Sequence, residues 1–138
     1  GLGGKRHDRR APYDQHGAES IQAARIENGW LGLYFEDVAF KYQRRVEDVA
    51  WATRLARSYM DVVTTSGPGM GQPAPLSKIV IMRQALGDVP LAIASGITPE
   101  DVGDYLDVAD CFLVATGISR SFTEFDPDLV KALVKAVR

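Results

Sequence analysis

The sequence has one cysteine and two histidines, and this scarcity excludes several kinds of site. Cys111 has no second cysteine with which to form an internal disulfide bond, and it lies in an apolar run, which favours a buried, unreactive thiol. His7 and His16 both lie in a polar leading segment. We therefore expect neither a Cys/His zinc site nor a Ser-His-Asp triad, and the sequence indicates no metal and no cofactor.

Long apolar runs and an excess of positive charge are also missing. No apolar run approaches the ~20 residues that a membrane-spanning helix needs, so no transmembrane segment is expected. The formal net charge of -2 over 138 residues argues against a basic surface for nucleic acid. With 46% hydrophobic and 25% charged residues, the composition is that of one globular domain.

Apolar periodicity divides the chain into an arm and a domain. Residues 1–17 carry basic residues and glycines with almost no apolar periodicity, which predicts a flexible basic arm. Over residues 18–138, segments with helical spacing alternate with four apolar runs, at 30–42, 61–66, 90–95 and 111–116. Because helix-length segments connect these runs, the sequence predicts an α/β domain with a parallel sheet.

Two neighbouring apolar runs end at a glycine beside hydroxyl residues, in residues 96–98 and 116–119. In parallel α/β folds, ligands bind at the carboxyl ends of strands, where glycine lets the backbone approach and helix N-termini offer free N–H groups. The last two strands of a (β/α)8 barrel bind phosphate in this way. The sequence therefore predicts an anion site made by Gly96, Ile97, Thr98, Thr116, Gly117, Ile118 and Ser119. The alternative is that the glycines only close tight turns.

Five further residues near strand ends are candidate ligand contacts. Thr64 and Ser66 alternate onto one face of the second run, where they can bond a ligand hydroxyl or simply pack. The stretch SGPGMGQP, which includes Gly67 and Gln72, lacks the Lys-Ser/Thr of a nucleotide-binding loop and is interpreted as a lid. Arg120 follows the second glycine junction and can either reach the same anion or remain solvated.

Lys41 is the candidate catalytic residue. It lies near the end of the first apolar run, where the catalytic residues of barrels emerge, and alternation places it on the same side as Asp37 and Ala39. A lysine there can contact a phosphate, or form a Schiff base if its pKa is lowered. The alternative is an exposed lysine at a strand end.

Residues 31–137 resemble the carboxyl half of the BtpA family of phosphate-binding (β/α)8 barrels. The family motifs TG-x-x-TG-x-P, GSGVTPENV and ADG-x-IVGTS are matched at residues 66–73, 95–102 and 109–119. Two departures are Tyr42, where the family has a histidine after the lysine, and Ala115, where it has a glycine. The resemblance implies a cytoplasmic, phosphate-binding protein.

The same resemblance implies that the chain holds four of the eight strands of a barrel. Four strands cannot close into a barrel, so we expect a half-barrel that pairs with another copy or with the missing half, or a fragment of a larger barrel. An open flavodoxin-like sheet is the alternative fold.

The predicted function is to bind or act on a small phosphorylated metabolite, such as a sugar phosphate or a nucleotide-like compound, by isomerase or lyase chemistry. The alternative is a non-catalytic binding or assembly protein. The expected partners are the phosphorylated ligand and a homo-oligomer or missing barrel half, with no nucleic acid.

Overall fold

Four strands form one parallel sheet in the computed structural model, which describes residues 15–38 and 46–138. The strands are β1 (Phe35–Asp37), β2 (Val62–Ser66), β3 (Leu91–Ala94) and β4 (Cys111–Leu113), and each pairs in parallel with the next in chain order. The predicted α/β class, built from parallel βα units, is therefore confirmed.

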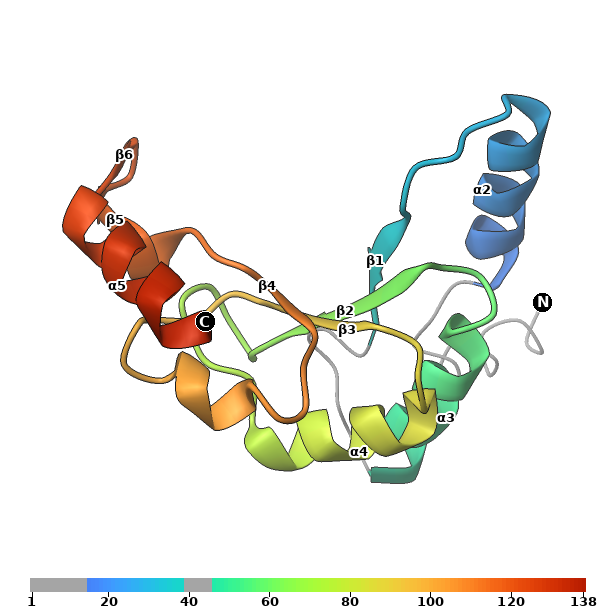
Figure 1. The fold of residues 1–138 in the computed structure, drawn as a ribbon. Helices are drawn as coiled ribbons and strands as arrows, with labels where there is room; N and C mark the ends of the chain where they lie inside the picture. The colour runs from blue at the N-terminus through green and yellow to red at the C-terminus, as the bar shows by residue number, and fades with distance from the viewer. Residues whose placement is uncertain (1–14, 39–45) are drawn as a thin grey trace.

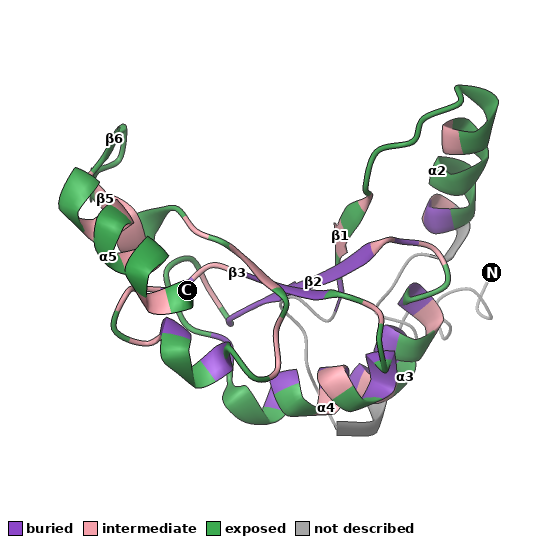
Figure 2. Cartoon of the chain, viewed as in Figure 1, coloured by how far each residue is buried: buried purple, intermediate pink, exposed green. Residues whose placement is uncertain are grey.

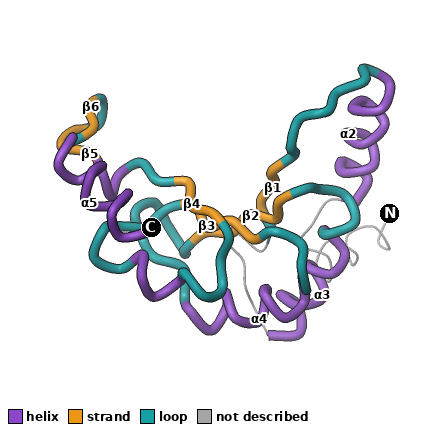
Figure 3. The backbone as a smooth tube through the Cα atoms, in the orientation of Figure 1, coloured by secondary structure: helices purple, strands orange, loops and turns teal. Residues whose placement is uncertain are grey.

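The helices lie on one face of this sheet and beyond its two edges. They are α2 (Gln15–Glu27), α3 (Val46–Ala56), α4 (Leu76–Leu86) and α5 (Pro127–Val137), with 3-10 turns η1 (Val102–Tyr105) and η2 (Thr116–Ile118). In Figure 1, α3 and α4 lie below the sheet, α2 lies beyond β1, and α5 lies beyond β4. Figure 3 shows the same arrangement, with β1 to β4 in the middle of the molecule and β5 and β6 beside α5.

Three differences from the sequence prediction concern the leading arm, the first strand and the segment before α5. Helix α2 begins at Gln15, inside the predicted arm, whose residues 1–14 lie outside the described residues. The first strand is limited to β1, and residues 39–45 also lie outside the description. Residues 119–125 were not assigned to any element from the sequence, and they form an antiparallel hairpin of β5 (Ser119–Ser121) and β6 (Glu124–Phe125).

The core lies between the sheet and the helices α3 and α4. Its strand side is formed by Val63, Leu91 and Ile93, and its helix side includes Ile79 and Met82, all with 0% exposure. Figure 2 shows this burial as purple segments on β2 and β3 and on parts of α3 and α4. The apolar runs of β2 and β3 are thus buried as expected for a parallel sheet, whereas the outer strands β1 and β4 remain partly exposed.

The opposite face of the sheet carries rows of side chains that the strand register aligns. Asp37, Thr64, Ala92 and Cys111 form one row across all four strands. The next row, one step nearer the carboxyl ends, contains Ser66, Ala94 and Leu113. Rows of this kind line the interior of a (β/α)8 barrel, and we call this side the inner face.

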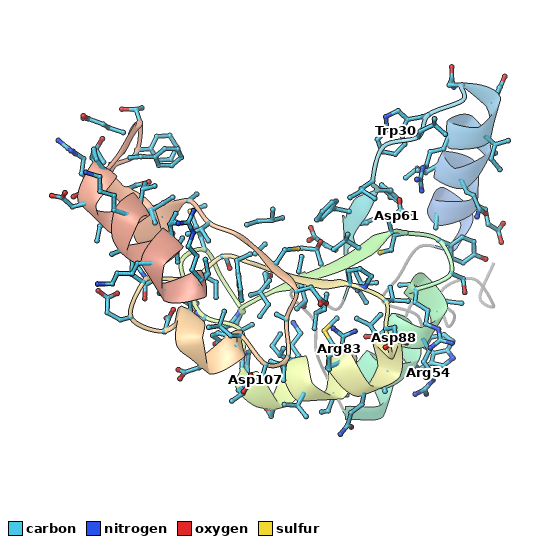
Figure 4. All side chains as sticks on the ribbon, viewed as in Figure 1. Trp30, Arg54, Asp61, Arg83, Asp88 and Asp107 are labelled. Carbon is cyan, nitrogen blue, oxygen red and sulfur yellow. The ribbon has the colours of Figure 1, made fainter. Side chains whose placement is uncertain are left out.

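Two aspartates hold the amino ends of the strands. Asp61, just before β2, accepts hydrogen bonds at 2.7 Å from the Tyr34 N–H and from the Arg25 guanidinium (Figure 4). Asp110, just before β4, accepts bonds from Arg83 at 2.7 Å and from the Leu91 N–H at 2.8 Å. These bonds satisfy backbone donors where neighbouring strands begin, and so position the sheet against α2 and α4.

No helix within residues 15–38 and 46–138 combines the length and the apolar character needed to cross a membrane.

Candidate functional site

The carboxyl ends of β2, β3 and β4 lie at one edge of the sheet, where three loops pack against each other. A Cβ atom placed on Gly96 would lie 2.4 Å from the carbonyl oxygen of Gln72. A Cβ atom on Gly117 would lie 1.9 Å from the carbonyl oxygen of Ile97. Only glycine permits such close backbone approaches. We call this surface, residues 66–73, 95–98 and 115–119, the rim.

The glycine-rich loop after β2, which is the first of the three rim segments, is tightly folded. A Cβ atom on Gly67 would lie 2.0 Å from the carbonyl oxygen of Gln72, so the loop turns back on itself. The Tyr105 hydroxyl, from η1, donates a 2.7 Å hydrogen bond to the carbonyl oxygen of Ala74 just beyond the loop. The side chain of Gln72 is exposed, as a ligand contact requires. Its role and that of the loop as a lid stay predictions.

Lys78, in the first turn of α4, is a buried cation beneath this loop. Lys78 is only 4% exposed, and its Nζ donates a 3.0 Å hydrogen bond to the Ser66 carbonyl oxygen at the end of β2. Burial lowers the pKa of Lys78 from 10.5 to about 8, because desolvation disfavours the charged form. No feature of the sequence predicts the burial of this residue, since a lysine near a helix start is normally solvent-exposed.

The backbone turns sharply where β3 ends. Ser95 and Gly96 have φ angles of 67° and 74°, and Ser95 is the one non-glycine residue of the described chain with a positive φ. This conformation is uncommon for a residue with a Cβ atom and concentrates at binding and active sites. The turn directs the chain from β3 into residues 96–98 of the rim.

Four backbone N–H groups of the rim have no acceptor among the described residues. They belong to Gly96, Ile97, Thr116 and Gly117. The neighbouring N–H groups are engaged: that of Thr98 donates to the Asp101 carboxylate at 2.8 Å, and that of Ile118 donates to Ala115 at 3.1 Å. Two adjacent loops thus offer unpaired donors, which is the chemistry that an anion requires.

The helix N-terminus expected after Gly96 is absent, and this corrects the sequence prediction. After Gly96 the chain forms η1, of four residues, and at Gly117 it forms η2, of three. Turns this short have few aligned peptide units and provide little of the macrodipole that a longer helix offers. Anion binding at the rim therefore depends on the individual N–H donors.

The rim hydroxyls differ in what they can donate. Thr98 Oγ1 accepts a 3.3 Å hydrogen bond from the Asp101 N–H, so its own O–H can still donate to a ligand. Ser119 Oγ donates to the Ala115 carbonyl oxygen at 2.7 Å, which uses its proton. Of the two apolar members of the predicted set, Ile97 is buried and Ile118 is half-buried. Both contribute to the predicted site through their backbone.

The two predicted cationic residues, Arg120 and Lys41, are not among the rim residues. Arg120 lies in the β5–β6 hairpin with its guanidinium 3.7 Å from the Glu124 carboxylate, and both side chains are largely exposed. Lys41 lies outside the described residues, so its catalytic role stays a prediction.

The inner face next to the rim carries two polar groups in register. Thr64 is 2% exposed, and its Oγ1 atom is buried without a hydrogen-bond partner among the described residues. Its partner on β1 is Asp37, an exposed residue whose pKa is raised because partial desolvation disfavours its carboxylate and Glu36 adds a nearby negative charge. Glu36 itself accepts a hydrogen bond from the Tyr34 hydroxyl. Ser66, in the next row, donates to the Gly67 carbonyl oxygen at 3.0 Å.

Asp37 is thus a candidate proton-transfer group that the sequence prediction did not assign. A carboxyl group with a raised pKa near a ligand site is suited to acid–base chemistry. The sequence placed Asp37 on the same side as Lys41 but did not show which strand would lie beside it. Over the described residues, no cluster of three or more His, Cys, Asp or Glu side chains is arranged to hold a metal ion.

Comparison with known proteins supports the barrel architecture. No protein-family model matches the chain. Geranylgeranylglyceryl phosphate synthase of Methanothrix thermoacetophila is 30% identical over 112 residues, which cover 76% of this chain and 42% of that protein. The chain spans less than half the length of the curated relatives that it matches.

Among solved structures, the chain is similar to two phosphoribosylanthranilate isomerases. That of Thermococcus kodakaraensis aligns with a TM-score of 0.65 and 22% identity over 88% of this chain and 58% of its own. That of Pyrococcus furiosus aligns with a TM-score of 0.63 and 19% identity over 87% and 56%. Both are (β/α)8 barrels, so the chain has the fold of part of such a barrel.

Proposed function

We propose that the chain binds a small phosphorylated metabolite, with the phosphate at the rim, as part of a phosphate-binding (β/α)8 barrel. The observation that carries this proposal is the set of four unpaired N–H groups on two neighbouring loops, those of Gly96, Ile97, Thr116 and Gly117. Backbone donors of this kind bind phosphate without a cationic side chain. The similar proteins are named after phosphorylated compounds, which is consistent with this ligand class.

The rest of the metabolite would lie over the inner face. Thr64 Oγ1, which has no hydrogen-bond partner among the described residues, would bond the ligand, and Asp37 would exchange a proton with the reacting group. Lys41, Ser66, Gly67, Gln72 and Arg120 are further proposed contacts, with Lys41 in the reactive or orienting role. This set of groups suits isomerase chemistry, in which a proton moves between atoms of one substrate, or lyase chemistry, in which proton transfer accompanies cleavage of a substrate bond into two products. We also propose that the barrel is a member of the BtpA family.

Titration with inorganic phosphate at constant ionic strength tests the proposal. Binding is measured by the broadening of the ³¹P resonance and by the midpoint of thermal unfolding. Constant ionic strength matters because phosphate also stabilises folded proteins through general exclusion from their surfaces. We expect saturable binding that raises the midpoint by mass action. The variant Gly117→Ala should lose saturable binding, because its Cβ atom would collide with the Ile97 carbonyl and displace the two loops.

Gly103→Ala is the matched control, since a Cβ atom there meets nothing within 4 Å. It should bind phosphate like the natural sequence. Lys41→Met should retain phosphate binding if Lys41 acts in the chemistry, and weaken it if Lys41 grips the anion. A folded natural chain that shows no saturable response to phosphate would refute the site.

A further inference from the structure

Both outer strands of the sheet have an unpaired edge among the described residues. In the strand order β1-β2-β3-β4, β1 pairs only with β2, and β4 pairs only with β3. Free edges present rows of N–H and C=O groups that readily pair with another strand. In a closed barrel these two edges would each adjoin a further strand.

Exposed apolar side chains are concentrated at the same two edges. Of the sixteen large hydrophobic residues that are exposed in the described part of the chain, twelve lie at the two ends of the sheet. Those at the β1 end are Ile21, Ile26, Trp30, Leu31, Leu33 and Phe35, and those at the β4 end are Leu106, Leu113, Phe122, Phe125, Val134 and Val137. Such clustering marks an interaction surface, because single exposed apolar residues are normally scattered.

A groove at the β4 end shows where added chain would lie. It has a volume of about 570 Å³ and runs between β4 and α5, with Cys111, Phe112, Leu133, Val134 and Val137 in its lining. An extended segment placed beside β4 would pair with its free edge and bury these side chains, as in strand addition.

The positions of α2 and α5 define what can occupy the edges. Helix α2 precedes β1 and lies beyond its edge, and α5 follows β4 and lies beyond the opposite edge (Figure 1). In a (β/α)8 barrel, one helix per strand forms the outer ring. The helix for each of the two open seams is therefore already supplied by this chain.

We propose that the two edges bind a segment of four parallel strands joined by three helices, in the order βαβαβαβ, which closes an eight-stranded barrel. A second copy of this chain is the wrong shape, because it would bring its own α2 to the seam that α5 already covers. The solved barrels agree in size, since 42% of one and 44% of the other lie outside their matches to this chain.

The first arm of the test uses the chain alone, in sedimentation velocity and hydrogen exchange. We expect no closed two-copy particle and fast exchange of the outward amides of β1 and β4. A stable dimer in which these amides are protected would overturn the proposal in favour of a second copy.

The second arm adds the part of the Methanothrix thermoacetophila relative that lies outside its match to this chain. We expect a 1:1 complex in which the edge amides of β1 and β4 become protected. Leu113→Lys, which places a charge in the inner row at the β4 edge, should weaken the complex at least tenfold. Val80→Lys, at a residue of α4 with comparable exposure (37% against 48%), should change the affinity less than twofold. Absence of the complex, or equal losses in both variants, would overturn the proposal.

Discussion

Thr64 and Thr65 are neighbours on β2, and each has a buried hydroxyl without a hydrogen-bond partner among the described residues. Strand alternation places them on opposite faces. Thr64 is in register with Asp37 and Ala92 on the inner face, whereas Thr65 is in register with Ile93 on the face that packs against the helices. The same chemical group is therefore next to the candidate site in one case and inside the core in the other.

This pair separates a ligand contact from packing. Thr64→Val and Thr65→Val should each leave the free energy of unfolding unchanged or raise it by about 1 kcal/mol, because each removes an unsatisfied buried hydroxyl without changing the shape. Only Thr64→Val should weaken the binding of a sugar phosphate, with ribose 5-phosphate as the probe. Urea denaturation and calorimetric titration measure the two effects. Equal affinities for both variants would remove Thr64 from the site.

Gly117→Ala should destabilise the rim. The added Cβ atom would lie 1.9 Å from the Ile97 carbonyl oxygen, so the backbone of one loop must move. Overpacking of this kind costs about 1–3 kcal/mol. Gly103→Ala meets no atom within 4 Å and should stay within about 0.5 kcal/mol of the natural chain. Equal urea midpoints for the two variants would show that the loops move apart without loss of stability.

Lys78 should make the stability of the chain rise with pH on the alkaline side. Its folded-state pKa of about 8 lies below the ordinary lysine value of 10.5, so the folded chain releases this proton first as the pH increases. Above pH 8 and up to about 10.5 the unfolded state holds more protons, and the free energy of unfolding therefore increases, by on the order of 1 kcal/mol per pH unit.

Replacement by methionine isolates this contribution. Lys78→Met also removes the hydrogen bond to the Ser66 carbonyl, so the informative quantity is the slope of stability against pH rather than its offset. Urea unfolding at several values between pH 7.5 and 10 should give a shallower slope for the variant. Parallel curves would show that the burial of Lys78 does not disfavour its charge.

Asp61 should stabilise the chain against acid. The Tyr34 N–H, together with the Arg25 guanidinium, holds the pKa of the Asp61 carboxyl below 3.8, although partial burial opposes this effect. The stabilisation is complete above the unfolded-state pKa and is lost as the pH falls through the folded-state pKa. For each protein, the loss is the decrease in the free energy of unfolding from its own value at pH 7. Between pH 5 and pH 2 this loss should therefore be smaller for Asp61→Asn than for the natural chain.

The control for this prediction is Asp107→Asn, an exposed aspartate in the segment before β4 (Figure 4). It should follow the acid dependence of the natural chain. Circular dichroism during acid titration measures all three proteins, and an unchanged profile for Asp61→Asn would contradict the role assigned to its hydrogen bonds.

Local signals in the sequence were enough to predict the order and type of most elements. Asp126 caps α5 by accepting hydrogen bonds from the Asp128 and Leu129 N–H groups, and an Asp-Pro pair before an apolar stripe is a local signal for such a helix start. Thr98 and Asp101 exchange the reciprocal bonds of a capping box. These features involve residues within a few positions of each other, so their geometry depends little on the rest of the chain.

The lengths of some elements could not be predicted from local sequence signals. The capping box at Thr98 leads only into the four residues of η1, of which Val102 and Tyr105 are buried. The β5–β6 hairpin also escaped prediction, since its strands of three and two residues are too short to show an alternating pattern.

Tertiary structure alone decided how the candidate site is assembled. The approach of Gly117 to Ile97, the register of Thr64 with Asp37 and the burial of Lys78 beneath the glycine-rich loop each join residues from different βα units. The sequence by itself determined a parallel α/β chain with glycines at its strand ends, because hydrophobic period and capping are local. Which N–H groups remain unpaired, and which polar side chains lose their water, depends on the packing of distant segments, and only the folded chain supplies that information.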